Sequence, residues 1–449
     1  MPAAAHASRT DAASSAAERL ALHGDLLDFN AAPAWGDVAS PAVRWRPDHW
    51  LLIEAGRIAA VQKEPPDAGW VRREHADQLI LPGFTDSHVH SPQLDVIGSY
   101  GSGLLDWLTT HTFPAEARHA DDAHAATVAP QFLDALLAHG TTSAVVFPTV
   151  HKASVDALFA AGQARGMRLI AGKVLMDRYA PSELRDDVAT AEREMAELIA
   201  RWHGRDRLAY AVTIRFAPTS SREQLALAGR FCRADPSLYL QTHLAESRDE
   251  VRWVSELFPE ARSYLDVYAG AGLLHARSVF AHGIWLDDAD RAAIAAAGAQ
   301  IAHSPSSNLF LGSGLFAWRQ AERAGVAVSL ASDVGGGTSL SLLRVMADAY
   351  KVQALGGERL TAWTALHAAT RGAAVALGLG DEIGTLDVGT MADVCIWDLA
   401  VGPVALRRAA VARSLHERVF AWMTIGDERN LVAAYVAGRL RHERASGPT

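Results

Sequence analysis

Short, almost continuously apolar runs alternate with longer amphipathic segments through the middle of the chain. We expect strands at residues 79–85, 141–147, 168–175, 208–216, 238–243, 278–282, 300–303 and 326–331. The segments between them, such as residues 122–137, 189–202 and 288–297, have the composition and the period of helices. Continuous apolar runs are typical of parallel strands that are buried on both faces. Eight strand–helix units predict an α/β fold, a (β/α)8 barrel of the TIM type over residues 81–382.

The two ends of the chain have a different pattern, with short β segments in which apolar and polar positions alternate. These segments are residues 20–30, 50–62, 79–81, 384–399 and 432–440, and Gly56, Gly389 and Gly438 stand where tight turns are expected. We therefore expect a small β-sandwich domain, built from residues 19–80 and 383–449, with the barrel inserted between its two parts. Residues 1–18 are rich in Ala and Ser and predict a disordered tail.

Composition and charge narrow the classes of function. A length of 449 residues with 49% hydrophobic content fits a globular chain that buries a large core. The net charge of −9 disfavours binding to nucleic acid polymers, and no apolar stretch is long enough to cross a membrane. Cys232 and Cys395 are the only cysteines, which excludes a disulfide framework and favours a reducing compartment. We expect a cytoplasmic protein with a small-molecule partner.

Polar residues follow the ends of several predicted strands. His88 and His90 are alternate residues on an extended segment, so both imidazoles can point to one ion, although an H-x-H pair alone is weak evidence. His243, His282 and Asp333 each follow a different strand. A barrel brings the carboxyl ends of its strands to one mouth, where barrel enzymes keep their active sites. Purely structural roles at all five positions would need five independent coincidences.

These side chains offer nitrogen and oxygen donors without a thiolate. Such a set suits a divalent ion that keeps one open coordination position, and zinc is the first expectation, with iron as the alternative. An ion of this kind lowers the pKa of a bound water to about 7 and so provides a nucleophile. Glu246 stands three residues beyond His243, where it can reach a substrate without binding the ion.

Several segments, in a fixed order, carry a resemblance to a known family. They are LPGFTDSHVHSPQ, LLDWLTTHTFPAE, RFAPTS, THLAES, AHGIWL, HSPSSN and SDVGGGTSLSLL. Together they resemble the guanine deaminases of the amidohydrolase superfamily, over about residues 20–440. The first segment is shared by the wider superfamily, whereas LLDWLTTHTFPAE is far more specific. The resemblance implies a zinc-dependent hydrolysis of guanine to xanthine and ammonia, with one zinc ion per chain, in a homodimer.

The resemblance also implies a role for individual residues. The metal ligands would be His88, His90, His243 and Asp333. Glu246 would be the proton shuttle, Asp333 would accept the proton of the attacking water, and His282 would lie beside that water, with its ligation of the metal left open. The purine would be held by Gln93, Arg215 and the Phe216 backbone, and would also contact His243, Glu246 and Asp333.

Other interpretations of the sequence stay open. A related aminohydrolase could act on 8-oxoguanine, a pterin or a triazine, and a non-catalytic barrel could serve as a binding protein. Relatives of the second kind typically lose metal ligands, whereas all the positions named above are intact here. Among single residues, Arg215 could form only an ion pair at the barrel rim, and Gln93 could bond only to backbone. Trp107 and Phe113 could be cavity wall or plain core.

Overall fold

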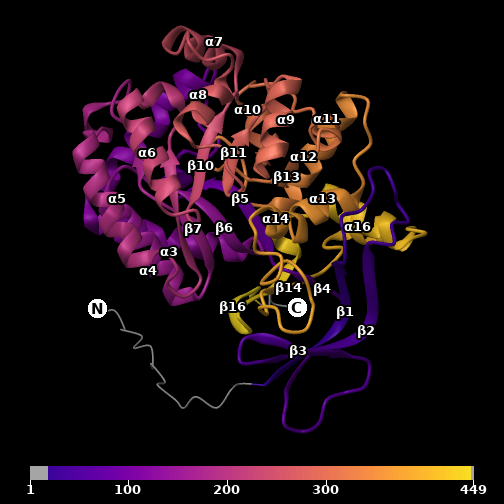
Figure 1. Ribbon diagram of the computed structural model, residues 1–449. Helices are drawn as coiled ribbons and strands as arrows, with labels where there is room; N and C mark the ends of the chain where they lie inside the picture. The colour runs from indigo at the N-terminus through magenta and orange to yellow at the C-terminus, as the bar shows by residue number, and fades with distance from the viewer. Residues whose placement is uncertain (1–18, 446–449) are drawn as a thin grey trace, which may run out of the picture.

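A parallel barrel forms the centre of the molecule (Figure 1). The computed structural model describes residues 19–445, so the predicted tail at residues 1–18 lies outside the described part. Around the barrel the strands are β5 (Phe84–His90), β6 (Thr141–Phe147), β7 (Arg168–Ala171), β9 (Leu208–Ile214), β10 (Tyr239–Leu244), β11 (Ser278–His282), β12 (Gln300–His303) and β13 (Ala327–Leu330). A short strand, β8 (Val174–Leu175), pairs with β9. The predicted (β/α)8 barrel is confirmed.

Two of the predicted strands are interrupted in the structure. Residues 79–82 end β4 (Val71–Pro82) in another sheet, and the first barrel strand begins after Gly83. A Cβ at Gly83 would lie 2.2 Å from the Thr142 hydroxyl, so the close approach at this junction requires glycine. The predicted strand at residues 168–175 breaks at Gly172, where a Cβ would lie 1.8 Å from the carbonyl oxygen of Ala211. Both breaks fall inside apolar runs, which is why hydrophobicity did not reveal them.

Helices surround the barrel (Figure 1). They are α3 (Asp122–Ala138), α4 (Lys152–Arg165), α5 (Val188–Trp202), α6 (Arg222–Ala234), α7 (Arg248–Leu257), α8 (Tyr264–Ala271), α9 (Asp288–Ala297), α10 (Pro305–Phe310), α11 (Trp318–Arg323), α12 (Leu342–Leu355), α13 (Ala362–Ala368) and α14 (Arg371–Ala376). Local signals set their ends: the Asp187 side chain accepts from the Thr190 N–H at the start of α5, and a left-handed Gly166 ends α4. The three helices predicted above are confirmed to within one residue. Within residues 19–445, no helix is long and apolar enough to cross a membrane.

Strands from both ends of the chain form a mixed sheet beside the barrel (Figure 1). Its order is β16 (Arg439–Glu443), β15 (Leu431–Val436), β14 (Val394–Trp397), β4, β1 (Leu20–Phe29), β2 (Val43–Glu54) and β3 (Arg57–Gln62). Gly56 and Gly438 have φ of +78° and +72° at the tight turns of two hairpins, as predicted. Helices α15 (Pro403–Ala410) and α16 (Leu415–Ile425) lie between β14 and β15 in sequence. The predicted boundaries at residues 80/81 and 382/383 stay a prediction.

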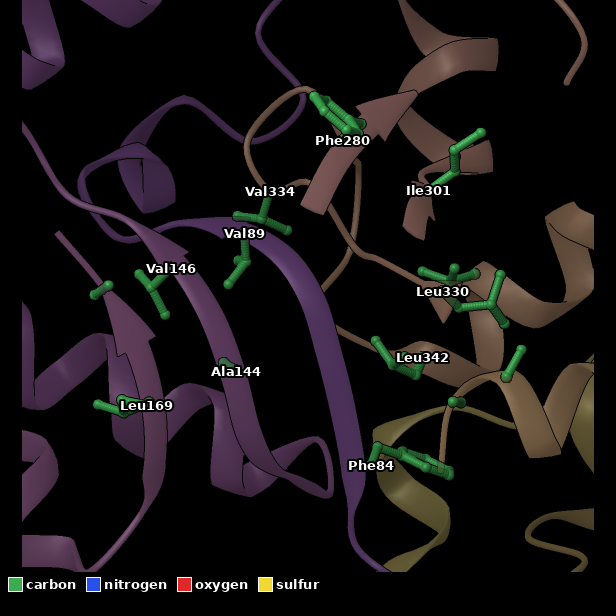
Figure 2. Packing of buried hydrophobic residues seen from close by; sticks show 14 of the residues in the cluster. Phe84, Val89, Ala144, Val146, Leu169, Phe280, Ile301, Leu330, Val334 and Leu342 are labelled. Atoms are coloured by element: carbon green, nitrogen blue, oxygen red, sulfur yellow. The ribbon is translucent and has the colours of Figure 1, made fainter. Parts of the chain in front are cut away.

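The alternation of side chains along each barrel strand divides the core into two parts. Val145, Ile170, Ala211, Tyr239 and Val279 belong to one buried cluster, which also includes Leu377 and Ile383. The residues on the other face of the strands pack against the helices; Figure 2 shows Ala144, Val146, Leu169, Ile301 and Leu330 of this larger cluster. The packed barrel leaves the carboxyl ends of its strands as the place where polar side chains gather.

Candidate active site

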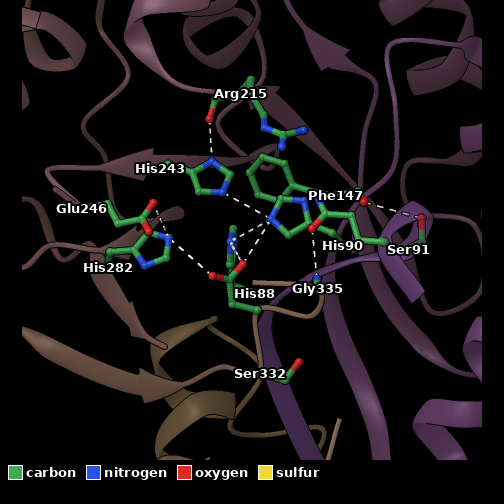
Figure 3. A network of polar contacts seen from close by, with 12 residues as sticks. His88, His90, Ser91, Phe147, Arg215, His243, Glu246, His282, Ser332 and Gly335 are labelled. Carbon is green, nitrogen blue, oxygen red and sulfur yellow. Dashed lines mark hydrogen bonds and ion pairs between the residues drawn. The ribbon is translucent and has the colours of Figure 1, made fainter. Parts of the chain in front are cut away.

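Four buried side chains converge at the carboxyl ends of the barrel strands, and Figure 3 labels the three histidines among them. His88 and His90 lie on β5, His243 lies on β10, and Asp333 follows β13. One nitrogen or oxygen atom from each lies within 4.8 Å of the others. The structure therefore brings together the four residues that were predicted as metal ligands, although they span most of the chain.

The spacing of these atoms fits a bound cation. The Nε2 of His90 lies 3.2 Å from the Nε2 of His88 and 3.3 Å from that of His243. Burial lowers the pKa of all three histidines, that of His90 to about 3, so each imidazole is neutral at pH 7 and has one lone pair. The Nδ1–H of His243 donates to the carbonyl oxygen of Arg215 at 2.6 Å, which leaves its Nε2 lone pair facing the other ligands.

Asp333 completes the donor set with a carboxylate. Its Oδ1 lies 3.1 Å from the Nε2 of His88 and 3.3 Å from that of His90. Burial opposes its ionisation, but the nearby histidines hold the pKa of Asp333 well below its usual range. Three imidazole nitrogens and one carboxylate oxygen, all without a thiolate, match the ligands of catalytic zinc. These residues fit the metal that the sequence predicted.

The backbone at the strand ends has an unusual conformation. Ala245, His282 and Asp333 have φ of +48°, +72° and +49°, in the left-handed region that residues with a Cβ rarely adopt. The N–H of Asp333 donates to the carbonyl oxygen of His88 at 2.9 Å, which fixes one ligand directly to another. Such conformations cost free energy and are typical of functional sites, where the surrounding structure enforces them.

Glu246 and His282 lie next to the four ligands but outside the set. The Oε2 of Glu246 lies 3.4 Å from the Nε2 of His282, which in turn lies 3.7 Å from Asp333 Oδ2. Burial, and then the charge of Asp333, raises the pKa of Glu246 to about 8. The Ser313 hydroxyl donates to Glu246 Oε1 at 2.9 Å, and Asn308 Oδ1 accepts from His282 Nδ1 at 2.8 Å. Glu246 is therefore a buried acid that can carry a proton at neutral pH.

A cavity of about 410 Å³, part of it open to solvent, lies beside these side chains. All the predicted substrate contacts line it: Gln93, Arg215, Phe216, His243, Glu246 and Asp333. Trp107 is cavity wall, together with Leu104 and Leu108, whereas Phe113 packs under the Arg215 guanidinium at 5.9 Å. The wall comes from the connection between β5 and α3, which contains the short helices α1 (Leu104–Trp107) and α2 (Phe113–Ala117).

Arg215 and Gln93 each have a second role besides lining the cavity. Arg215 forms an ion pair with Glu116, in the buried interior rather than at an exposed rim. The Oε1 of Gln93 accepts from the Gly335 N–H at 3.0 Å, and its Nε2 donates to Glu116 at 3.0 Å. The ion pair and the backbone bond that the sequence left open are thus both present, between cavity-lining side chains and residues outside the lining.

Sequence reasoning missed four buried residues that form hydrogen bonds with side chains or backbone of the site: Glu116, Glu250, Asn308 and Ser313. Glu250 accepts the Glu246 N–H at 2.9 Å, and burial raises its pKa to about 7. The sequence carries one local signal for Glu250, because Ser247 and Glu250 form a capping box at the start of α7. The contacts of the other three join distant parts of the chain and leave no local pattern.

Comparison with known proteins agrees with this geometry. The family model described as "Amidohydrolase family" matches residues 79–441, which is most of the chain. The chain belongs to the amidohydrolase family. Within this family, the chain is 41% identical to guanine deaminase of Escherichia coli (strain K12) over 430 residues, 94% of this chain and 98% of that protein.

Solved structures of the family extend the similarity to three dimensions. E. coli guanine deaminase superposes with a TM-score of 0.92 at 41% identity and covers 95% of this chain and 100% of that one. Guanine deaminase from C. acetobutylicum, solved with guanine bound in its active site, gives a TM-score of 0.85 at 27% identity, over 94% of this chain and 100% of that one. Both similarities include the barrel and the sheet from the two chain ends, since they extend over nearly the whole chain.

Proposed function

We propose that this chain hydrolyses guanine to xanthine and ammonia. The proposal rests on the placement of Glu246. This buried acid lies next to the set of three histidines and one aspartate, and it lines the same cavity as Arg215 and Gln93. Similarity to the guanine deaminase of E. coli, at 41% identity over 94% of the chain, supports the choice of substrate.

We assign His88, His90, His243 and Asp333 as the ligands of one zinc ion per chain, with iron as the alternative metal. The chemistry that zinc supplies in such a site is the activation of a water molecule, through a lowering of its pKa to about 7. The protein's part is to keep the three imidazoles neutral and the carboxylate ionised, as their burial and mutual contacts do.

Two side chains transfer the protons, and a third holds the water. Hydrolysis forms a C–O bond at the amino-bearing ring carbon and breaks the C–N bond, so a ring nitrogen and the leaving amine must each receive a proton. Asp333 accepts the proton of the attacking water. Glu246, whose raised pKa favours its protonated form at neutral pH, gives its proton to the ring nitrogen. The two protons of the attacking water then go to the leaving amine, through Glu246, and back to Glu246, which restores the acid. His282, 3.4 Å from Glu246, holds the water in place.

Substrate binding falls to other side chains that line the same cavity. The Arg215 guanidinium offers fixed paired N–H donors, which match a purine carbonyl oxygen. Gln93 adds an amide N–H, and the Phe216 backbone lies against the ring. These N–H donors therefore suit a neutral base that carries a carbonyl group.

We further propose that the protein acts in the cytoplasm as a homodimer. Its two cysteines, Cys232 and Cys395, are both free and buried, which fits a reducing compartment. Sedimentation of the purified protein at micromolar concentration would give the mass of two chains, and the mass of one chain would refute the dimer.

The test of the function is guanine turnover with and without a chelator. We expect the loss of guanine absorbance to stop after metal removal and to return with one equivalent of zinc. The same assay with 8-oxoguanine, a pterin and a triazine identifies the preferred ring. A protein that contains zinc but leaves guanine unchanged while it turns over another of these compounds would refute guanine as the substrate.

A further inference from the structure

Glu116 is a buried carboxylate directly behind the substrate side of the cavity. It lies on α2, its side chain is 0% exposed, and it is not among the residues that line the cavity. Its Oε1 accepts two hydrogen bonds, one from Arg215 Nη1 and one from Gln93 Nε2 at 3.0 Å. One carboxylate oxygen thus holds both Arg215 and Gln93, which line the cavity.

The first consequence concerns the orientation of the Gln93 amide. A carboxylate oxygen can only accept, so the Gln93 atom that bonds to Glu116 must be its NH2 group. The backbone N–H of Gly335 can only donate, so the atom that it meets must be the Gln93 carbonyl oxygen. Both ends of the amide are therefore fixed, and the second N–H of Nε2 is the donor that Gln93 has left for a ligand.

The second consequence concerns charge. Arg215 is buried, with 3% of its side chain exposed, and Glu116 is the carboxylate that it pairs with among residues 19–445. The pair has no net charge, whereas an unpaired guanidinium at the same place would strongly attract an anion. With Glu116 in place, this side of the cavity offers N–H donors without net charge.

We propose that Glu116 is a positioning residue that selects an uncharged base with a carbonyl oxygen at this end of the ring. The proposal rests on the proposed function. An amine in place of the carbonyl would place its own N–H donors against those of Arg215 and Gln93. The cavity therefore rejects 2,6-diaminopurine. An anion would find no free positive charge, so xanthine, which loses a proton more readily than guanine, leaves the site after the reaction.

The test removes the charge of Glu116 and keeps its shape. In Glu116→Gln we expect the KM for guanine to rise roughly tenfold or more, with kcat within about threefold of the parent, because the buried hydrogen bond from Arg215 then has a neutral acceptor and is weaker. The xanthine ratio, which is the inhibition constant of xanthine divided by the KM for guanine, should fall about tenfold below that of the parent. The reason is that the Arg215 charge is then unpaired and attracts the xanthine anion. A structural defect alone would not move the preference from guanine to xanthine.

Two further variants keep the proposal falsifiable. Glu116→Gln combined with Arg215→Gln leaves no unpaired charge, so guanine should bind weakly while the preference for xanthine disappears. Asp393→Asn is the matched control, because it removes a buried carboxylate from the Arg207 ion pair far from the cavity. It should lower the melting temperature without changing KM or the xanthine ratio.

The outcomes separate this inference from the proposed function. If the parent does not turn over guanine, the proposed function fails. If the parent does, a parent-like KM and xanthine ratio in Glu116→Gln overturn the role of Glu116. The role is also overturned if Asp393→Asn raises KM and lowers the xanthine ratio as much as Glu116→Gln does. If Glu116→Gln does not fold, the double variant decides, and parent-like affinity for guanine there overturns the proposal.

Discussion

Replacing Glu246 by Gln separates proton transfer from binding. The amide nearly matches the carboxylic acid in shape but cannot carry a proton between the ring nitrogen and the leaving amine. Loss of a positioned acid–base group costs about 10²- to 10⁴-fold in rate. At about 1.4 kcal/mol per factor of ten, the barrier should rise by about 3 to 6 kcal/mol.

The structural cost of the same substitution is much smaller. A glutamine oxygen can still accept from the Ser313 hydroxyl, and the bond from the residue 246 N–H to Glu250 is unchanged. At most one hydrogen bond is lost, about 1 kcal/mol. Burial raises the pKa of Glu246 to about 8 and so favours its protonated form at pH 7, which makes the change in charge on substitution small. Zinc content and melting temperature should therefore stay close to those of the parent.

The assay measures guanine turnover, zinc content, guanine binding and melting temperature on one purified sample. Glu194→Gln is the matched control, because it neutralises a carboxylate that pairs with the buried Lys173 outside the cavity. The control should keep its turnover. Turnover of Glu246→Gln within a few-fold of the parent would refute the shuttle role. Loss of zinc from this variant would instead show that Glu246 binds the metal or supports a residue that does.

Three further predictions test the metal, the substrate contact and the core. Replacing both His88 and His90 by Ala should abolish bound metal and activity together, and full metal occupancy measured by elemental analysis would mean that the site is misassigned. Arg215→Lys keeps the charge but loses the paired donors, so KM for guanine should rise about 10- to 100-fold; equal affinity would remove Arg215 from the cavity. Burial raises the pKa of the Cys232 thiol to about 12, and also that of Cys395, so iodoacetamide should label neither in the native protein, and both after unfolding, by mass spectrometry.

The four metal ligands could be predicted because their positions follow from strand geometry. Alternate residues of one strand share a side, and strand ends of one barrel share a mouth, so His88, His90, His243 and Asp333 had to meet if the barrel was correct. The same geometry also brings His282 to that mouth, and the choice of the other four as ligands came from the resemblance to the guanine deaminases. The amphipathic helices could be predicted for the same reason, since their pattern is local.

The contacts that hold the other side chains of the site could not be predicted in this way. Arg215 and Glu116 are 99 residues apart in sequence, and Asn308 reaches His282 across 26 residues. Each contact depends on how a connection folds back over the barrel, which hydrophobic periodicity does not determine. The strand breaks at Gly83 and Gly172 were missed because steric fit, rather than polarity, decides them.

The cavity wall and the metal ligands belong to different parts of the chain. Leu104, Trp107 and Leu108 come from a single connection between β5 and α3, whereas the ligands stand on or directly after strands that the whole barrel holds in place. During evolution, mutation of that connection can therefore reshape the cavity for a new heterocycle while the hydrolytic centre stays intact. A library restricted to residues 102–120 would sample new substrates at little risk to the reaction itself.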